Sequence, residues 1–369
     1  MPIRVLHIIG SLRLGGAQVS LKYLVENAEP KHIETFVYPL RPKYADIPIK
    51  GDVIKIPYLN YDPRKFLTIL RICRKHNIDI IHAHLDKSIL GSLLATFFCK
   101  VKVVIHERGP VFRKNFKYSI YRFLLRLLHH RAAAIIANSH ATAARLVKKA
   151  KIDPKQITVI PNAVDFEKFN PQRTERSRTR KMLKANPDDI VLGFVGRLNY
   201  VKGVDILIKA MPLLLKKSPQ YLLALVGQGP QEPYLHKLVN QFDISDRVRF
   251  LGFNDNVPEI MDAFDIAVVP SRQESFGIVA VEIMRKKIPM VCSDAEGLTE
   301  LAENEVTALV LTDNTPQQIC SCVDRLANDK TLQEKLTDNA YSFSEKFSIK
   351  NCVDAVQKIY FKVTNSNRG

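Results

Sequence analysis

Short apolar runs rich in β-branched residues alternate with helical patterns along almost the whole chain. Two strands that are connected by a helix usually lie parallel in one sheet, because the helix carries the chain back to the edge where the first strand began. The runs of the first half lie at 3–9, 35–39, 53–56, 80–84, 103–106, 134–138 and 158–160. Those of the second half lie at 190–196, 222–227, 249–252, 266–270, 290–293 and 308–311. We therefore predict an α/β fold of two Rossmann-like, doubly wound parallel-sheet domains in series.

Length and composition fit two such domains. The chain has 369 residues, of which 46% are hydrophobic, enough to bury a core in each domain. A polar, basic stretch at 171–187 separates them, so we predict domains at 1–170 and 171–348. The last helix, expected at 349–363, belongs to a segment, 349–369, that we expect to pack back on the first domain. The carboxyl ends of both sheets are expected to face a central cleft, where ligands bind in such folds.

The net charge of +18 is concentrated in the first domain. Residues 1–170 hold 29 Lys and Arg against 12 Asp and Glu, whereas the rest of the chain holds 26 against 25. Such a field attracts nucleic acid, a lipid headgroup or a phosphorylated acceptor. The stretch 111–131 interleaves aromatic residues and leucines with cations such as Arg113, Lys114 and Lys117. It is typical either of a helix on an anionic membrane surface or of a core-facing helix with a basic outer face.

Several classes of protein are disfavoured by what the sequence lacks. The six cysteines show no C-x-x-C pair and no histidine at metal-ligand spacing, so we expect buried free thiols and no metal site. No run of about 18 apolar residues and no cleavage-site pattern occurs, which favours a cytoplasmic protein. The aromatic residues do not follow the strand pattern of an RNA-binding sheet, so a nucleic-acid-binding module is disfavoured.

The stretch from Glu274 to Glu282 predicts an anion site. The strand at 266–270 ends at a proline, and helical spacing is expected from Phe276 onward. Gly277 and Ile278 would lie in the first turn, whose unpaired amides and dipole attract phosphate. Two carboxylates eight residues apart could then bind hydroxyl groups on either side of a diphosphate. Two solvated glutamates on an amphipathic helix are the plainer reading.

Two other loops of the second domain carry similar signals. Arg197 and Lys202 lie between a strand and a helix, where they could hold a diphosphate, although loop cations are often only solvated. Gly227 ends the next strand and Phe253 the one after it, so both could line a flat slot for a nucleobase.

In the first domain, Gly16 and His106 are the candidate residues. Gly15 and Gly16 follow the first strand and could allow positive φ and the close approach of a ligand, or could form a structural turn. The pattern is not G-x-G-x-x-G, so a dinucleotide site is disfavoured. His106 ends a strand shortly before Gly109 and would face the cleft. The remaining histidines considered, expected to be structural or at the surface, are His82, His84, His129 and His130.

Taken in order along the chain, these motifs resemble the retaining glycosyltransferases of family 4, which have the two-domain GT-B fold. The motifs are Gly15-Gly16, 161–165, Arg197, Lys202-Gly203, 226–230, 270–271 and the stretch from Glu274 to Glu282. The resemblance implies that the first domain binds the acceptor and the second a nucleoside-diphosphate sugar, with UDP or GDP favoured. The implied catalytic residues are His106, Glu274, Arg197 and Lys202. The implied donor-binding residues are Gly16, Arg197, Lys202, Gly227, Phe253, Glu274, Phe276, Gly277, Ile278 and Glu282.

The resemblance also implies a reaction and its partners. The sugar would pass, with retention of its anomeric configuration and without metal or cofactor, to a lipid-linked or cell-envelope glycan acceptor. Such an enzyme would be peripheral on the inner face of the membrane. The alternatives are a nucleotide-sugar epimerase or hydrolase of the same fold and, less favoured, a basic nucleic-acid-binding protein. Two departures from the family pattern leave the identity of the transferred sugar open. Glu296 replaces a glycine, and the loop at 304–308 lacks its customary glycines.

Overall fold

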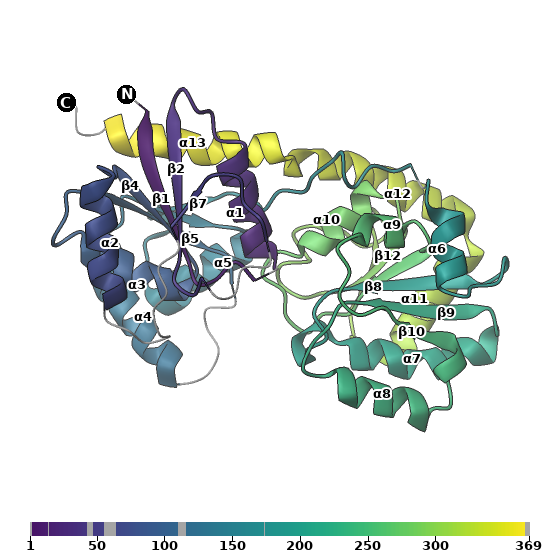
Figure 1. Cartoon of the computed structure of the whole chain (residues 1–369). Coiled ribbons are helices and arrows are strands. Elements are labelled where there is room, and N and C mark those ends of the chain that lie inside the picture. Colours follow the sequence, from purple (N-terminus) through teal and green to yellow (C-terminus); the bar gives the residue numbers. More distant parts are fainter. Residues whose placement is uncertain are drawn as a thin grey trace. The chain divides into compact units, whose positions relative to one another are not determined.

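A computed structural model describes residues 2–13, 15–42, 47–54, 64–109, 116–172 and 174–365. The chain forms two compact units, which are Met1–Ala163 together with Ile349–Gly369, and Val164–Ser348 (Figure 1). The division thus follows Ala163, not residue 170 as expected. Val164 donates its N–H to the carbonyl of Phe347 at 2.9 Å, so the chain enters and leaves the second unit at neighbouring positions.

The first unit contains a seven-stranded parallel sheet in the order β3-β2-β1-β4-β5-β6-β7. Its strands are β1 (Ile3–Ile9), β2 (Ile33–Pro39), β3 (Asp52–Val53), β4 (Ile80–His84), β5 (Lys102–Glu107), β6 (Ala134–Ala137) and β7 (Ile157–Val159). Its α-helices are α1 (Gly16–Glu26), α2 (Arg64–Lys75), α3 (Asp86–Ala95), α4 (Phe116–Leu128), α5 (His140–Arg145) and α13 (Ile349–Asn365). The order reverses direction between β1 and β4, which is the switch point of a doubly wound sheet.

Two cores cover the faces of this sheet. On one face, Ile69 of α2, Leu93 of α3 and Leu125 of α4 pack with strand residues such as Ile81. On the other face, α13 packs with strand residues such as Val5. The members that α13 contributes to this second core are Cys352, Val353, Val356, Ile359, Tyr360 and Val363. The last helix is therefore part of the first unit.

The second unit contains a six-stranded parallel sheet in the order β10-β9-β8-β11-β12-β13. Its strands are β8 (Ile190–Val195), β9 (Tyr221–Val226), β10 (Val248–Phe250), β11 (Ile266–Val269), β12 (Met290–Ser293) and β13 (Leu309–Leu311). Its α-helices are α6 (Arg176–Met182), α7 (Val204–Lys217), α8 (Glu232–Gln241), α9 (Val257–Met261), α10 (Ile278–Arg285), α11 (Pro316–Asn328) and α12 (Lys330–Ser344).

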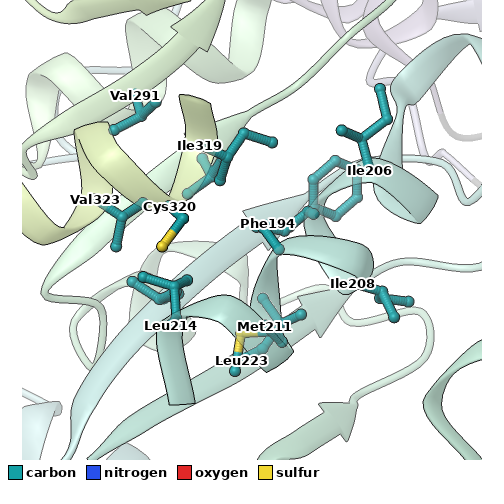
Figure 2. Packing of buried hydrophobic residues seen from close by; sticks show 14 of the residues in the cluster. Phe194, Ile206, Ile208, Met211, Leu214, Leu223, Val291, Ile319, Cys320 and Val323 are labelled. Atoms are coloured by element: carbon teal, nitrogen blue, oxygen red, sulfur yellow. The ribbon is translucent and has the colours of Figure 1, made fainter. Parts of the chain in front are cut away.

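The core of this unit shows why its strands are strongly apolar. Figure 2 shows Met211 and Leu214 of α7 and Ile319 of α11 packed with Phe194 of β8. Strands covered on both faces by helices have no polar face, so their sequences read as continuous apolar runs. Burying these side chains is the main favourable contribution to folding, at about 25 cal/mol for each Å² of apolar surface.

The fold prediction is confirmed: both halves are parallel α/β sheets, and each predicted run overlaps a strand. The third is shorter than predicted, since β3 ends at Val53 and residues 55–56 lie outside the described part of the chain. All six cysteines are free thiols, of which Cys99 and Cys322 are only partly buried. Within the described ranges, no helix has both the length and the apolar character needed to cross a bilayer.

Candidate functional site

The loops that follow β8 and β11 are joined at the carboxyl edge of the second sheet. Arg272 donates its backbone N–H to Val201 at 2.7 Å. Its guanidinium also donates two hydrogen bonds, both 2.7 Å long, to the carboxylate of Asp205 in the first turn of α7, and lies over the ring of Tyr200. A two-point bond of this kind fixes geometry as well as adding energy. The two loops therefore form one rigid support.

On this support, two of the predicted site residues meet. Lys202 forms an ion pair with Glu274, and their side chains are 24% and 15% exposed. The second carboxylate oxygen of Glu274 accepts the N–H of Ser275 at 3.2 Å. Arg197 is exposed, and its guanidinium has no partner among the residues that the structure describes. Lys202 is thus neutralised locally, whereas the charge of Arg197 is available to an anion.

Glycines at two corners allow this geometry. Gly203 has φ +69°, and a Cβ atom there would lie 1.9 Å from the carbonyl oxygen of Pro270. Gly277 has φ +93° and precedes α10, and its Cβ would lie 2.5 Å from a methyl carbon of Leu298. L-residues rarely adopt such φ values. The glycines therefore serve loop packing, which the sequence alone did not indicate for Gly277.

The helix at the site begins later than predicted. Helical spacing from Phe276 was expected, but α10 begins at Ile278. Glu274 therefore lies in the preceding loop, and of the two glutamates only Glu282 lies on the helix. The ring of Phe276 is buried against Phe347, so only its backbone is available to a ligand. Ile278 is partly buried and contributes one of the first amides of the helix.

Glu282 lies on α10, one turn after the amides of its first residues. Its side chain is partly buried, and this burial raises the pKa of its carboxyl group to about 7, with Lys168 opposing the rise. A buried carboxyl with few charged neighbours suits the recognition of hydroxyl groups, to which it can donate or accept a hydrogen bond.

The loops after β9 and β10 stack on the loop after β8. Gly227 donates its N–H to Gly252 at 2.7 Å, and a Cβ at Gly227 would lie 2.0 Å from the carbonyl oxygen of Gly196. The space at Gly227 is thus filled by a neighbouring loop and is not left open on that side. Phe253, directly after Gly252, is 48% exposed and presents an aromatic ring at this edge.

Gly16 and His106 belong to the first unit. Gly16 is the first residue of α1, and Gly15 before it has φ 175°, which is ordinary extended backbone. Neither glycine therefore uses the positive φ that the sequence suggested. His106 is buried in β5, and its Nδ1 atom lies 3.1 Å from both His82 Nε2 and Arg108 Nη2. Burial and the nearby charge of Arg108 hold the pKa of His106 well below its usual value.

A buried histidine cluster around His106 was not predicted from the sequence. His7, His82 and His84 are fully buried, with ring nitrogens that lie within 4.8 Å of one another, in the arrangement of candidate metal ligands. Of the two places expected for His82 and His84, burial excludes the surface and leaves the structural one. Their spacing of two in a strand was the available signal, because such residues lie on one face of a sheet.

The described part of the basic stretch at 111–131 has one side toward the core and exposed apolar side chains on another. Residues 111–115, including Arg113 and Lys114, and the side chain of Lys117 lie outside the described part. In α4, Tyr121 and Leu125 face the core, whereas exposed apolar side chains occupy the outer face. Those exposed side chains are Ile120, Phe123 and Leu127.

Comparisons with known proteins agree with this architecture. The sequence model of glycosyl transferases group 1 matches residues 175–343, and that of Glycosyltransferase Family 4 matches residues 14–168. The uncharacterized glycosyltransferase MJ1607 of Methanocaldococcus jannaschii is 33% identical over 210 residues, or 56% of this chain. Those residues span 54% of that relative, little more than half of its length.

A more distant relative and a solved structure extend the match. The UDP-Gal:alpha-D-GlcNAc-diphosphoundecaprenol alpha-1,3-galactosyltransferase of Escherichia coli is 24% identical over 306 residues, which are 81% of this chain and 79% of its own length. The crystal structure of Anabaena Alr3699/HepE in complex with UDP-glucose covers 98% of this chain and 100% of its own, with a TM-score of 0.84 at 23% identity. The fold of this chain is therefore GT-B.

Proposed function

Because the chain belongs to glycosyltransferase family 4, we propose that it transfers a sugar from a nucleoside-diphosphate donor to a lipid-linked or cell-envelope glycan acceptor. We propose further that the transfer retains the anomeric configuration and needs no metal. The observation that carries the proposal is the joined pair of loops. There, Arg197 has no partner within the described part of the chain, and Lys202 and Glu274 form an ion pair beside the first amides of α10.

In this proposal, Arg197, Lys202 and the amides of Gly277 and Ile278 bind the diphosphate. Charge develops on the leaving diphosphate in the transition state, and donors that are already oriented stabilise it there. Glu274 orients Lys202 and, with its free lone pairs, accepts hydrogen bonds from the transferred sugar. The cations supply the charge that a divalent metal ion supplies in other transferases.

Glu282 and Phe253 would bind the nucleoside end of the donor. Glu282 would bind the ribose hydroxyl groups, and the exposed ring of Phe253, with the Gly227 loop, would stack on the base. From the first unit, His106 would face the transferred sugar, and Gly16 would contact phosphate or acceptor. The resemblance of the motifs to those of family 4 glycosyltransferases, and the structure of a neighbour in fold in complex with UDP-glucose, support a UDP-linked donor.

A matched pair of lysine variants tests the donor site. Lys202→Ala should lose the stabilisation of the leaving diphosphate and reduce turnover by about 100-fold or more. Lys216, exposed on α7 in the same unit, provides the control, and its alanine variant should keep full turnover. A thermal-shift series with UDP-, GDP- and ADP-sugars identifies the base, since a ligand that binds only the folded state raises its melting temperature. Equal turnover in both variants would refute the donor site.

The reaction class has its own test. A transferase releases free nucleoside diphosphate in proportion to added acceptor, whereas a hydrolase releases it without acceptor and an epimerase releases none. Polyprenyl-diphosphate-linked sugars are the acceptors to try first, because a relative is named for a diphosphoundecaprenol acceptor. NMR of the product distinguishes retention from inversion at the anomeric carbon. Release that is independent of every acceptor would rule out transfer.

We propose that the protein binds an anionic membrane through an apolar surface on the first unit. Here α3 contacts both α2 and α4 (Figure 1), and seven exposed apolar side chains, between 43% and 61% exposed, lie on these helices or at the end of α3. They are Leu67, Leu94, Phe97, Phe98, Ile120, Phe123 and Leu127. The exposed cations nearby include Arg71, Lys100, Arg126 and Arg131, and the guanidinium of Arg131 lies over the ring of Phe97 at 4.0 Å.

Apolar side chains bordered by cations match the boundary between headgroups and acyl chains of an anionic bilayer. We expect Phe98→Ser and Phe123→Ser together to release the protein from vesicles that contain anionic lipid, and Arg126→Glu to weaken binding by about 1–2 kcal/mol, through the lost attraction and the new repulsion. Lys358→Glu, exposed on α13 against the opposite face of the sheet, is the control for charge. Equal loss in Lys358→Glu would mean that net charge, not this surface, holds the protein to the membrane.

A further inference from the structure

Four buried histidines share one face of the first sheet. His7 of β1 is paired in register with His82 of β4, and His84 of β4 is paired with His106 of β5. Residues in register on parallel strands point to the same face, and all four side chains are at most 1% exposed. This is the face that α13 covers, and Tyr360 of α13 is hydrogen-bonded to Nδ1 of His82.

All four imidazoles are neutral at physiological pH. Burial is the main cause that lowers each pKa, and the positive charge of Arg108 lowers each of them further. A neutral imidazole has one nitrogen that donates and one that accepts. Each hydrogen bond in the cluster therefore restricts where a proton can be.

The guanidinium of Arg108 determines which nitrogen of His106 carries the proton. It carries only donors, so His106 Nδ1, 3.1 Å from Arg108 Nη2, must accept, and the proton of His106 must be on Nε2. His82 Nε2 lies 3.1 Å from the same Nδ1 atom and must therefore donate to it. The other nitrogen of His82, Nδ1, then has no proton and accepts from the hydroxyl group of Tyr360.

We propose that Arg108, His82 and Tyr360 are positioning residues that hold His106 in a single neutral form, with its proton on Nε2. In that form, the Nε2–H group of His106 is buried and has no acceptor within the described structure, so it is left for a ligand. This group is the hydrogen-bond donor that His106 would offer to the transferred sugar, so the inference rests on the proposed function. Burial raises the pKa of the Tyr360 hydroxyl, which therefore keeps its proton and remains a donor.

The same contacts argue against the alternative role of the cluster as a metal site. A metal ion would require a free lone pair on His82, yet one of its nitrogens donates to His106 and the other accepts from Tyr360. Arg108 adds a positive charge 3.1 Å from His106. Binding a divalent cation would cost both hydrogen bonds and oppose that charge.

Nitrogen-15 NMR of the full chain with labelled histidine rings tests the proposal directly. A ring nitrogen with a proton differs clearly in chemical shift from one without, and His82→Gln and His106→Gln assign the two signals. We expect His106 in one form, with the proton on Nε2, in the wild-type protein. A proton on Nδ1 of His106 in the wild type would overturn the proposal whether or not any variant folds.

Two variants distinguish fixing of the proton from general support. Arg108→Met removes the obligatory donor, so a second population should appear in which both His106 and His82 carry their protons on Nδ1. Tyr360→Phe removes the bond at the other end but leaves Arg108, so His106 should keep its single form. An unchanged single form in Arg108→Met, or a mixed one in Tyr360→Phe, would contradict the proposed chain of hydrogen bonds.

Sugar transfer gives the functional readout. Turnover in Arg108→Met should fall in proportion to the fraction of His106 that carries its proton on Nδ1, because that fraction cannot donate. Full turnover despite a mixed population would refute the positioning role. Full turnover in His106→Gln would instead remove His106 from the proposed function, while the NMR result would stand, so the two failures can be told apart.

Discussion

Glu282 should make the protein less stable at neutral pH than a variant with an amide in its place. Burial raises the pKa of its carboxyl group from 4.5 to about 7 in the folded protein, while the unfolded chain keeps the ordinary value. Between these two pH values, the unfolded chain releases a proton that the folded protein retains. The free energy of unfolding therefore falls as pH rises from about 4.5 to about 7 and is unaffected by this group above and below that range.

The size of the effect follows from the shift. One pH unit corresponds to 1.36 kcal/mol, so a shift of about 2.5 units corresponds to about 3 kcal/mol. This is an upper bound, because part of the Glu282 side chain reaches solvent. Glu282→Gln is neutral at every pH. It should match the wild type near pH 4.5 and exceed it by up to about 3 kcal/mol at pH 8.

Urea unfolding of both proteins at several pH values, followed by circular dichroism, gives the difference in stability. Protection of the α10 amides from hydrogen exchange reports on the second unit alone, which matters because two units need not unfold together. Glu334→Gln, exposed on α12 of the same unit, is the control and should change stability by less than about 0.5 kcal/mol. A difference between Glu282→Gln and wild type that does not depend on pH would refute the reasoning.

The other predictions concern packing, charge and metal. Gly203→Ala should cost more than about 2 kcal/mol, because a Cβ would lie 1.9 Å from the Pro270 carbonyl at φ +69°. Gly91→Ala, whose added Cβ would lie 3.7 Å from its nearest neighbour, should be neutral or stabilising. Calorimetry of the two variants measures both effects, and equal melting temperatures would contradict the role given to the Pro270 contact. Asp262→Asn should cost about 3–5 kcal/mol, because it leaves Lys286 buried without its partner, and an unchanged urea midpoint would contradict this. Chelation with EDTA should leave turnover unchanged if the proposed cations suffice; a loss that added metal restores would exclude the metal-independent reaction.

The sequence predicted the fold well because buried parallel strands carry a strong local signal. The runs from 3–9 to 308–311 are mostly apolar because helices cover both faces of each sheet, and the short loops between elements add glycine or proline. The boundary between the units was less accurate, because it depends on the contact of Val164 with Phe347, residues far apart in sequence.

The candidate site was predictable only where its residues act locally. Lys202 and Gly203 could be assigned to a loop between a strand and a helix, but the ion pair of Lys202 with Glu274 joins residues 72 positions apart. The bond between Arg272 and Asp205 spans 67 positions and was missed for the same reason. The start of α10 was misplaced, since helix ends depend on the φ value of Gly277, which spacing alone does not reveal.

The discontinuity of the first unit has a consequence for how the protein is made. Its sheet is synthesised before the second unit, but α13, which covers one face of that sheet, is synthesised after that unit. During translation, the four histidines and Arg108 therefore lack their cover until the intervening unit has been completed. A nascent chain halted before residue 349 should therefore expose the four histidines and Arg108 to chaperones. The second unit, whose two ends have both been synthesised by then, could already be folded.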